Sequence, residues 1–288
     1  GATMIKQLKL TGAYLVELPE KSDIRLAAAV EDYRFIASEE LEYVVPNYMN
    51  TIKSIPNDQY FSYQWGLTNT GQGSFYGGEG EWPPIQGKAG CDINVQPLWD
   101  VGFTGSHDVV VAVIDTGVDY NHPDLKNNIL YRDGVLVGHD YINDDDDPMD
   151  DHSHGTHCAG IIGAVGNNRI GVSGVNWNVS IMPLKAADAE GHLPSDAVIS
   201  SIEYAVANGA NIISCSYGKY AFDEAEYDAM RKALDYGVLF CCAAGNETID
   251  LDAMPSYPAC YDLSNIISVA ASDPNDELAP FSCYGAKN

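Results

Sequence analysis

From about residue 108 onward, five short apolar runs alternate with three stretches of helical periodicity, and this alternation constrains the fold most strongly. The apolar runs cover residues 109–114, 180–184, 212–215, 238–242 and 266–270. The helical stretches cover residues 154–165, 195–208 and 223–236. Runs that are apolar along both faces are typical of parallel strands with helices on both sides of the sheet. The sequence therefore predicts an α/β fold with a doubly wound, mostly parallel sheet, whose active site lies at the carboxyl ends of the strands.

The N-terminal segment has a different pattern. Residues 13–18 and 41–45 are predicted to be strands, and residues 24–30 are predicted to be a helix. These elements would form a small α+β unit. We therefore expect two domains, covering residues 1–53 and 54–288.

The charge of the chain limits its partners. Of the 288 residues 45% are hydrophobic, which is enough to bury a core. The formal net charge is -26, and a field of that sign repels nucleic acid. No apolar run is long enough to span a bilayer, and the first twelve residues lack the apolar region of a signal peptide. We expect a monomer that binds neither nucleic acid nor a membrane.

The seven cysteines divide into groups by their surroundings. Cys215, Cys241 and Cys242 lie in apolar runs and are predicted to be small buried hydrophobic residues. Cys260 and Cys283 lie in turn-rich segments and could form a disulfide. The odd number leaves at least one thiol unpaired, and the absence of a CxxC motif argues against a zinc site.

A carboxylate ends the first apolar run, in the segment VVVAVIDTGVDYNHPDL at residues 109–125. At the carboxyl end of a central strand, Asp115 would be well placed to orient an imidazole. The alternative is an aspartate that stabilises the turn leaving the strand. Considered by itself, Asp115 favours this turn interpretation.

A histidine lies at the predicted start of a helix, in the segment DDHSHGTHCAGIIGAV at residues 151–166. His154 is a candidate general base, and Ser153 or a neighbour could cap the helix. Gly155 and Gly160 would let the helix pack closely against another backbone. His157, three residues later, could be read as a metal ligand, but no HExxH motif is present and we predict a packing role.

An asparagine follows the predicted strand in the segment GVLFCCAAGNE at residues 237–247. The side-chain amide of Asn246, beyond the strand end, could donate a hydrogen bond to a developing oxyanion. The alternative is an asparagine that serves only in the turn, which is the commoner role.

Taken together, in this order and spacing, IDTGVDYNHPDL, HGTHCAG and AAGN resemble the subtilisin family of serine proteases, and the resemblance runs from about residue 58 to residue 288. It implies a serine endopeptidase that cleaves polypeptides outside the cell. In that enzyme Asp115 orients the imidazole, His154 is the general base and Asn246 is the oxyanion donor.

The sequence departs from the family at the nucleophile. The family carries its serine in a segment of the Gly-Thr-Ser-Met-Ala type, and the sequence has no such segment. Ser282 matches a structural serine. We therefore expect these 288 residues to lack nucleophilic catalysis by themselves, and we interpret them as part of an enzyme. The alternatives are an inactive pseudoprotease or peptide-binding fragment and, less well matched to the motifs, an acidic calcium-binding adhesion module.

The resemblance also implies how substrate would bind. Family members hold an extended peptide between two backbone edges. The residues that match these edges and the wall of the adjoining pocket are Gly191, His192, Leu193, Ser216, Tyr217, Gly218, Ala243, Ala244 and Gly245. Asp150 and Asp151 precede His154 closely and could favour a basic substrate residue at the neighbouring subsite.

Two places could bind Ca²⁺, which prefers carboxylate and carbonyl oxygens. By resemblance, the first site takes side chains from Asp58, Asp124 and Asn168 and carbonyls from Val165, Ile170 and Val172, with Gly166 as the alternative to Val165. The second lies in the acidic run HDYINDDDDPMDD at residues 139–151, with Asp140, Asp145 and Asp147 as the chosen ligands. An acidic, solvated loop is the alternative there.

The N-terminal segment resembles the family's inhibitory prodomain, a partner that assists folding and occupies the active-site groove. The matching stretch is LEYVVPNY at residues 41–48, and PNDQYFSYQWGL at residues 56–67 resembles the start of a mature domain. A maturation cut is therefore expected near residues 50–56. The alternative is an N-terminal β-extension that is never removed.

Overall fold

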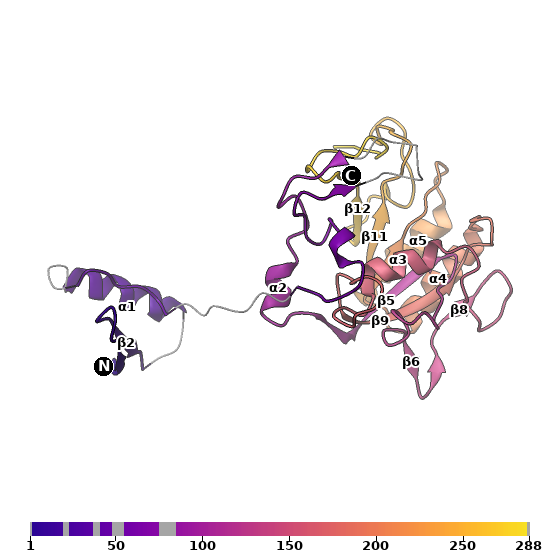
Figure 1. Cartoon of the computed structure of the whole chain (residues 1–288). Helices are drawn as coiled ribbons and strands as arrows, with labels where there is room; N and C mark the ends of the chain where they lie inside the picture. Colours follow the sequence, from indigo (N-terminus) through magenta and orange to yellow (C-terminus); the bar gives the residue numbers. More distant parts are fainter. Residues whose placement is uncertain (1, 20–22, 37–40, 48–54, 75–84, 287–288) are drawn as a thin grey trace. The chain divides into compact units, whose positions relative to one another are not determined.

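The computed structural model describes the chain except residues 1, 20–22, 37–40, 48–54, 75–84 and 287–288 (Figure 1). The chain divides into two compact units, Gly1–Ile52 and Lys53–Asn288. No helix among the described residues is both long and apolar enough to cross a membrane.

In the first unit, β1 (Thr3–Gln7) pairs with β2 (Tyr14–Glu17) in an antiparallel hairpin, and α1 (Asp23–Ile36) follows. The predicted strand at residues 41–45 is wrong, because residues 41–47 form no strand. The guanidinium of Arg34 on α1 donates a 3.0 Å hydrogen bond to the carbonyl of Val44, so this run lies against the helix. The strand that pairs with β2 is β1, which precedes it in the sequence and was not predicted.

The second unit contains a six-stranded sheet with the order β12-β11-β10-β5-β9-β8, in which every neighbouring pair is parallel. The strands are β5 (Gly105–Asp115), β8 (His139–Asp140), β9 (Asn178–Lys185), β10 (Ile212–Cys215), β11 (Leu239–Ala243) and β12 (Ile266–Val269). The five predicted strands and the doubly wound fold class are confirmed. The edge strand β8 was not predicted, since two residues are too few to form a periodic pattern.

Three helices correspond to the predicted helical stretches: α3 (His154–Gly163), α4 (Ser195–Ala207) and α5 (Glu224–Ala233). The carboxylate of Asp223 caps α5 by accepting hydrogen bonds from the backbone of Ala225 and Glu226. A short 3₁₀ turn (Leu234–Tyr236) continues α5, and Gly237 then ends it in the left-handed conformation, with φ 74°.

The remaining elements are short. They are the 3₁₀ turn η1 (Phe61–Tyr63), helix α2 (Gln96–Asp100) and two small hairpins, β3 (Gly73–Ser74) with β4 (Ile85–Gln86) and β6 (Tyr131–Arg132) with β7 (Val135–Leu136).

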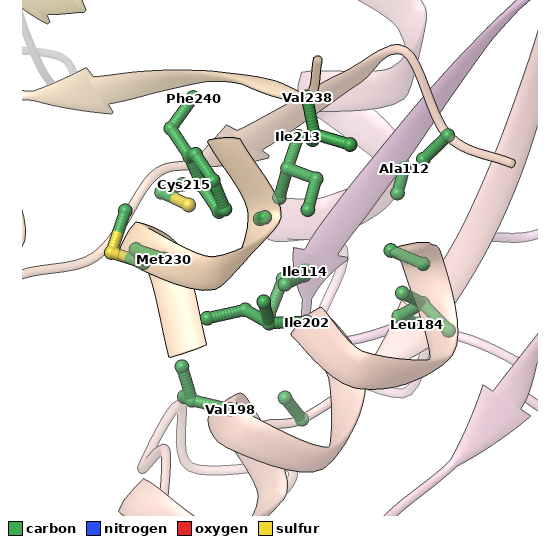
Figure 2. Close-up of a cluster of buried hydrophobic side chains, with 14 of the residues drawn as sticks. Ala112, Ile114, Leu184, Val198, Ile202, Ile213, Cys215, Met230, Val238 and Phe240 are labelled. Carbon is green, nitrogen blue, oxygen red and sulfur yellow. The ribbon is translucent and has the colours of Figure 1, made fainter. Parts of the chain in front are cut away.

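Successive residues of β5 contribute to two different core layers. Ala112 and Ile114 belong to the layer packed against α4 and α5, which includes Ile202 and Met230 (Figure 2). Val111 and Val113 belong to the layer on the other face, which contains residues of α3. Burial of each large aliphatic side chain contributes about 1.5–3 kcal/mol, so both layers hold β5 in place. The end of β5 is thereby fixed between the two helical layers.

The cysteines contribute packing rather than a cross-link. Cys215 and Cys242 are buried neighbours on β10 and β11, as predicted, while Cys241 is half-buried. All seven cysteines, which lie in the part of the chain that the structure describes, are thiols. The disulfide between Cys260 and Cys283 that the sequence allowed is therefore not formed. The buried sulfur of Cys283 instead lies 3.3 Å from Oε2 of Glu247.

Candidate active site

A buried carboxylate and a half-exposed imidazole meet where β5 ends and α3 begins. Oδ1 of Asp115, the last residue of β5, lies 2.7 Å from Nδ1 of His154, the first residue of α3. Asp115 is 5% exposed, whereas the His154 side chain is 48% exposed. Because Nδ1 donates its proton to the carboxylate, Nε2 of the neutral ring has a lone pair and can accept a proton. The pair thus has the geometry of an oriented general base.

Backbone groups hold the Asp115 carboxylate in position. The amide of Thr116 donates a 2.8 Å hydrogen bond to Oδ1. The carbonyl of Asp115 accepts hydrogen bonds from the amides of Ala186 and Ala187, which follow the neighbouring strand β9. The carboxylate is therefore fixed by two strand ends and not by its contact with His154 alone.

Asp150 organises the loop that delivers His154. Its carboxylate accepts 2.9 Å hydrogen bonds from the Thr116 hydroxyl and from the amides of His152, Ser153 and Thr156. Asp150 therefore caps α3, and the side chain of Ser153 makes no capping bond. Burial raises the pKa of Asp150, but hydrogen bonds, led by that from the Thr156 hydroxyl, outweigh it and leave the pKa below its usual value.

Lys185, at the end of β9, lies almost entirely inside the protein. Its Nζ donates to the carbonyls of Thr116 and Ala187, both at 2.9 Å, and to the carboxylate of Asp151 at 2.6 Å. These bonds use all three of its donors. Sequence reasoning missed this residue, although a lysine that ends a buried apolar run is itself a signal. Because Asp150 and Asp151 both have partners, the predicted preference for a basic substrate residue loses its basis.

Two expectations for α3 are wrong. His157 is exposed rather than packed, because its position on the helix turns the ring away from the sheet. Gly160 has open space around it, so it does not provide a close approach. Gly155 does, since a Cβ there would collide with the carbonyl oxygen of Gly117.

A thiol lies beside the Asp115–His154 pair. Sγ of Cys158 is 3.9 Å from Nδ1 of His154 and shares a hydrogen bond with Ser216. Burial, followed by the nearby charge of Asp115, raises the pKa of Cys158 to about 11. The thiol therefore stays protonated near neutral pH, and it faces the nitrogen already bonded to Asp115. Both facts argue against Cys158 as a nucleophile.

Beyond Ser216, a cavity of about 230 Å³ brings several predicted substrate residues together. Those that line it are Ser216, Tyr217, Gly218, Ala243, Gly245 and Asn246. Glu247, which was not predicted, also lines it, and its carboxylate accepts a 2.9 Å hydrogen bond from the backbone amide of Asn246. Ala244 does not line it: this side chain is buried with Leu251 and Cys283 behind the wall. The structure thus brings Asn246 and the 216–218 edge to one cavity.

The second predicted edge lies beside the histidines. Gly191 faces the ring of His152, which is 6.4 Å from the ring of His154. Both backbone polar groups of His192 are bonded to Asp188, and the Leu193 side chain packs against the core. The Gly191 amide also donates to the carbonyl of Asp188, so pairing with a peptide would use the Gly191 carbonyl and the backbone of Leu193.

Ser282 has the structural role that was predicted. It is fully buried, its hydroxyl accepts a 2.9 Å hydrogen bond from the Ala271 amide, and it donates to the carbonyl of Cys283 at 2.8 Å. A hydroxyl fixed in this way has no access to His154.

The residues predicted for the first cation site do come together. The carboxylates of Asp58 and Asp124 are buried, and neither has a Lys, Arg or His partner among the described residues. Asp58 accepts hydrogen bonds from the amides of Asn167 and Asn168, and Asp124 accepts them from the Asn168 side chain and the Val172 amide. Burial, opposed by these bonds and reinforced by the Asp124 charge, raises the pKa of Asp58.

Further contacts hold this loop against the two carboxylates. The amide of Val165 donates to the carbonyl of Asp124, and that of Ile170 donates to Oδ1 of Asn168. At Gly171, which has φ 45°, a Cβ would collide with the Asp124 carboxylate. Two neighbouring buried carboxylates, with no basic partner among the described residues, are the kind of hard anionic ligand that a divalent cation prefers.

In the second acidic segment the carboxylates already serve the loop. Asp140 is buried and accepts three hydrogen bonds from Ile142 and Asn143. Asp145 accepts from the Asp147 amide, and Asp147 accepts a 2.7 Å hydrogen bond from the Tyr120 hydroxyl. That hydrogen bond raises the pKa of Tyr120 to about 12. Cation binding here stays a prediction, beside the solvated-loop alternative.

Comparison with known proteins agrees with this geometry. Residues 106–288 match the Subtilase family of peptidases, and the chain belongs to this family. It is 35% identical over 246 residues to a thermophilic serine proteinase of Bacillus sp. (strain AK1), and 38% identical over 194 residues to thermitase of Thermoactinomyces vulgaris. It is also 31% identical over 280 residues to a cell wall-associated protease of Bacillus subtilis (strain 168).

The matched regions cover different shares of these proteins. They take in 85%, 67% and 94% of this chain, in the same order. They correspond to 53%, 65% and 29% of the respective relatives. The chain thus spans about half of the thermophilic proteinase and just under two thirds of thermitase.

Proposed function

We propose that this chain provides the general base, the oxyanion donor and the peptide groove of a serine endopeptidase. The observation that carries the proposal is the 2.7 Å contact between Asp115 and His154 at the end of a central parallel strand. The hydroxyl nucleophile would be a serine other than the buried Ser282.

In the proposed reaction, Nε2 of His154 takes the proton of the attacking hydroxyl and later gives it to the leaving amine. Asp115 keeps the imidazole in the required tautomer and stabilises the imidazolium. The Asn246 side chain donates to the oxyanion of the tetrahedral intermediate, a contact that lowers the barrier by about 3–4 kcal/mol in subtilisin, a member of this family.

The substrate would be a polypeptide in extended conformation. Its backbone would pair with the edge at Ser216–Tyr217–Gly218 on one side and with Gly191 and Leu193 on the other. The side chain before the scissile bond would enter the cavity beside Asn246, whose small wall residues Ala243 and Gly245 leave room for it.

Calcium would stabilise the fold at the site formed by Asp58, Asp124 and the 165–172 loop. The buried pair of carboxylates supports this assignment, because the attraction of a cation would offset their mutual repulsion. Asp140, Asp145 and Asp147 form the second, weaker candidate.

The first compact unit would act as a prodomain, with a maturation cut near residues 50–56. We also propose that the enzyme works outside the cell, in line with the name of the cell wall-associated relative.

The first test is the encoding reading frame beyond position 288. A downstream Gly-Thr-Ser segment supports the endopeptidase, and a stop codon supports a peptide-binding pseudoprotease. The second test is proteolysis of casein by the form carrying that segment. Activity that survives both His154→Ala and Asp115→Asn would refute the assignment of His154 as the general base. As a control, Asp108→Asn, near the other end of β5, should leave activity unchanged.

A further inference from the structure

A partly buried ion-pair network lies where the two predicted substrate edges lead into helices. Lys219 directly follows the edge at residues 216–218, and Ser195, the first residue of α4, comes two residues after the edge at residues 191–193. Nζ of Lys219 lies 3.0 Å from the Ser195 hydroxyl. Lys219, which follows one edge, is thus linked to α4, which follows the other.

The same ammonium bonds to two carboxylates of α5. Nζ of Lys219 is 2.8 Å from Asp223, the capping residue of α5, and 2.9 Å from Glu226 in its first turn. With Ser195, these acceptors use the three donors of the ammonium. The partly exposed Lys219 side chain lines the cavity beside Asn246, but its three donors are already used within the network, which argues for a structural role rather than a binding role.

Glu226 anchors the network in the protein interior. Its side chain is 0% exposed, and its carboxylate accepts hydrogen bonds from the hydroxyls of Tyr217, at 3.1 Å, and Tyr261, at 3.0 Å. Tyr217 is the middle residue of the 216–218 edge. A buried carboxylate without partners would be strongly unfavourable, so the fold requires Tyr217 and Lys219 to stay in place around it.

The backbone of the edge is fixed at the same point. The amide of Lys219 donates to the carbonyl of Tyr257 at 2.8 Å, and the amide of Tyr257 donates back at 2.7 Å. Opening of the edge would therefore break this bridge and the side-chain network together.

We propose that Lys219 and Glu226 are positioning residues that set the separation of the two peptide-binding edges. This inference rests on the proposed function, since it concerns the groove of the proposed endopeptidase. It predicts that loss of the network weakens binding of long peptides, which lie along both edges, more than binding of short ones.

The test uses the full chain with Lys219→Met. The matched control is Lys232→Met on α5, which removes the exposed Lys232–Asp228 pair. Hydrogen exchange measures opening of the bridge through the Lys219-position and Tyr257 amides. We expect exchange at least tenfold faster in Lys219→Met and unchanged exchange in Lys232→Met. Unchanged protection in Lys219→Met would overturn the inference.

Peptide affinity is the second measurement. A labelled hexapeptide should lose about tenfold in affinity for Lys219→Met, while a dipeptide amide should change less than twofold. Equal losses for both lengths would indicate a general structural effect and overturn the inference. If no peptide binds the wild-type chain, the proposed groove fails, and the exchange result still decides whether the network holds the edge.

Milder variants cover the case in which Lys219→Met does not fold. Lys219→Arg should keep the protection of the bridge, because a guanidinium can replace the ammonium. Tyr217→Phe removes one hydrogen bond to Glu226 and should give a smaller, intermediate increase in exchange. No increase in Tyr217→Phe, together with full loss of protection in Lys219→Arg, would also contradict the inference.

Discussion

Gly155 lies directly against the carbonyl oxygen of Gly117, so that α3 touches the turn that follows Asp115 with no side chain between them. The hydrogen bond between Asp115 and His154 depends on this close approach, because the two residues occupy the adjoining ends of β5 and α3. The packing of α3 at Gly155 therefore affects the position of His154 relative to Asp115.

The first prediction concerns this contact. Gly155→Ala should destabilise the protein by about 1–3 kcal/mol, because the added methyl group has no space and must push α3 away from the strand end. Gly160→Ala on the same helix, where a Cβ meets open space, should instead stabilise it by about 0.5–1 kcal/mol. Urea unfolding measures both, and equal stability of the two variants would contradict the account.

The second prediction concerns catalysis by the proposed enzyme. In a form that carries the serine, Asp115→Asn should lower kcat by about 10⁴-fold with little change in KM, which is roughly the loss measured for the triad aspartate of subtilisin itself. The physical reason is loss of the tautomer that leaves Nε2 free to accept a proton. Steady-state kinetics on a chromogenic peptide give the result. A loss confined to KM would show that Asp115 acts in binding.

The third prediction concerns Lys185. Lys185→Met should cost about 3–5 kcal/mol of stability, because it leaves two buried carbonyls and the Asp151 carboxylate without their partner. Lys126→Met, at an exposed lysine, should change stability by less than about 0.5 kcal/mol. Asp151→Asn should cost less than about 1 kcal/mol, since Asp151 is 48% exposed. The measurement is urea unfolding, and a loss for Lys185→Met no larger than the Lys126 control would refute this role.

The fourth prediction concerns calcium. Free Ca²⁺ at 100 times its dissociation constant should stabilise the chain by about 2.7 kcal/mol, and chelation should reverse the gain. Asp124→Asn should abolish most of the effect, because it removes one of the two buried charges. Asp133→Asn, in an exposed turn, should keep it. Thermal unfolding with Ca²⁺ or chelator tests this, and an unaltered response in Asp124→Asn would place the cation elsewhere.

The sequence was sufficient to predict the residues that end strands or begin helices at the site. Asp115, His154 and Asn246 follow or precede periodic segments, so their positions could be inferred from the pattern of a parallel sheet. The supporting contacts could not be inferred, because they join residues far apart in sequence. Lys185 bonds to Thr116, and Lys219 bonds to Ser195, through side-chain geometry that periodicity does not encode.

The errors have similar causes. The apolar run at residues 41–45 has strand composition, but its contact with Arg34 is a tertiary interaction that local propensity does not contain. The possibility of a Cys260–Cys283 bond rested on turn-rich surroundings, whereas disulfide formation depends on the distance and direction of the two Cβ atoms.

The last prediction concerns acid. The pKa of Asp150 lies below its usual value of about 3.9, because its carboxylate accepts hydrogen bonds that stabilise the charged form more than burial destabilises it. A group whose folded pKa is lowered contributes stability that is present above its unfolded pKa and lost as pH falls through its folded pKa. The Asp150 contribution should therefore be constant near neutral pH and disappear below about pH 3.9. Because Asp150 caps α3, its protonation should also loosen the segment that carries His154. Urea unfolding across this pH range measures the difference in unfolding free energy between wild type and Asp150→Asn. We expect this difference to shrink as pH falls. A difference that stays constant at pH values below about 3.9 would show that the charge of Asp150 does not stabilise the loop.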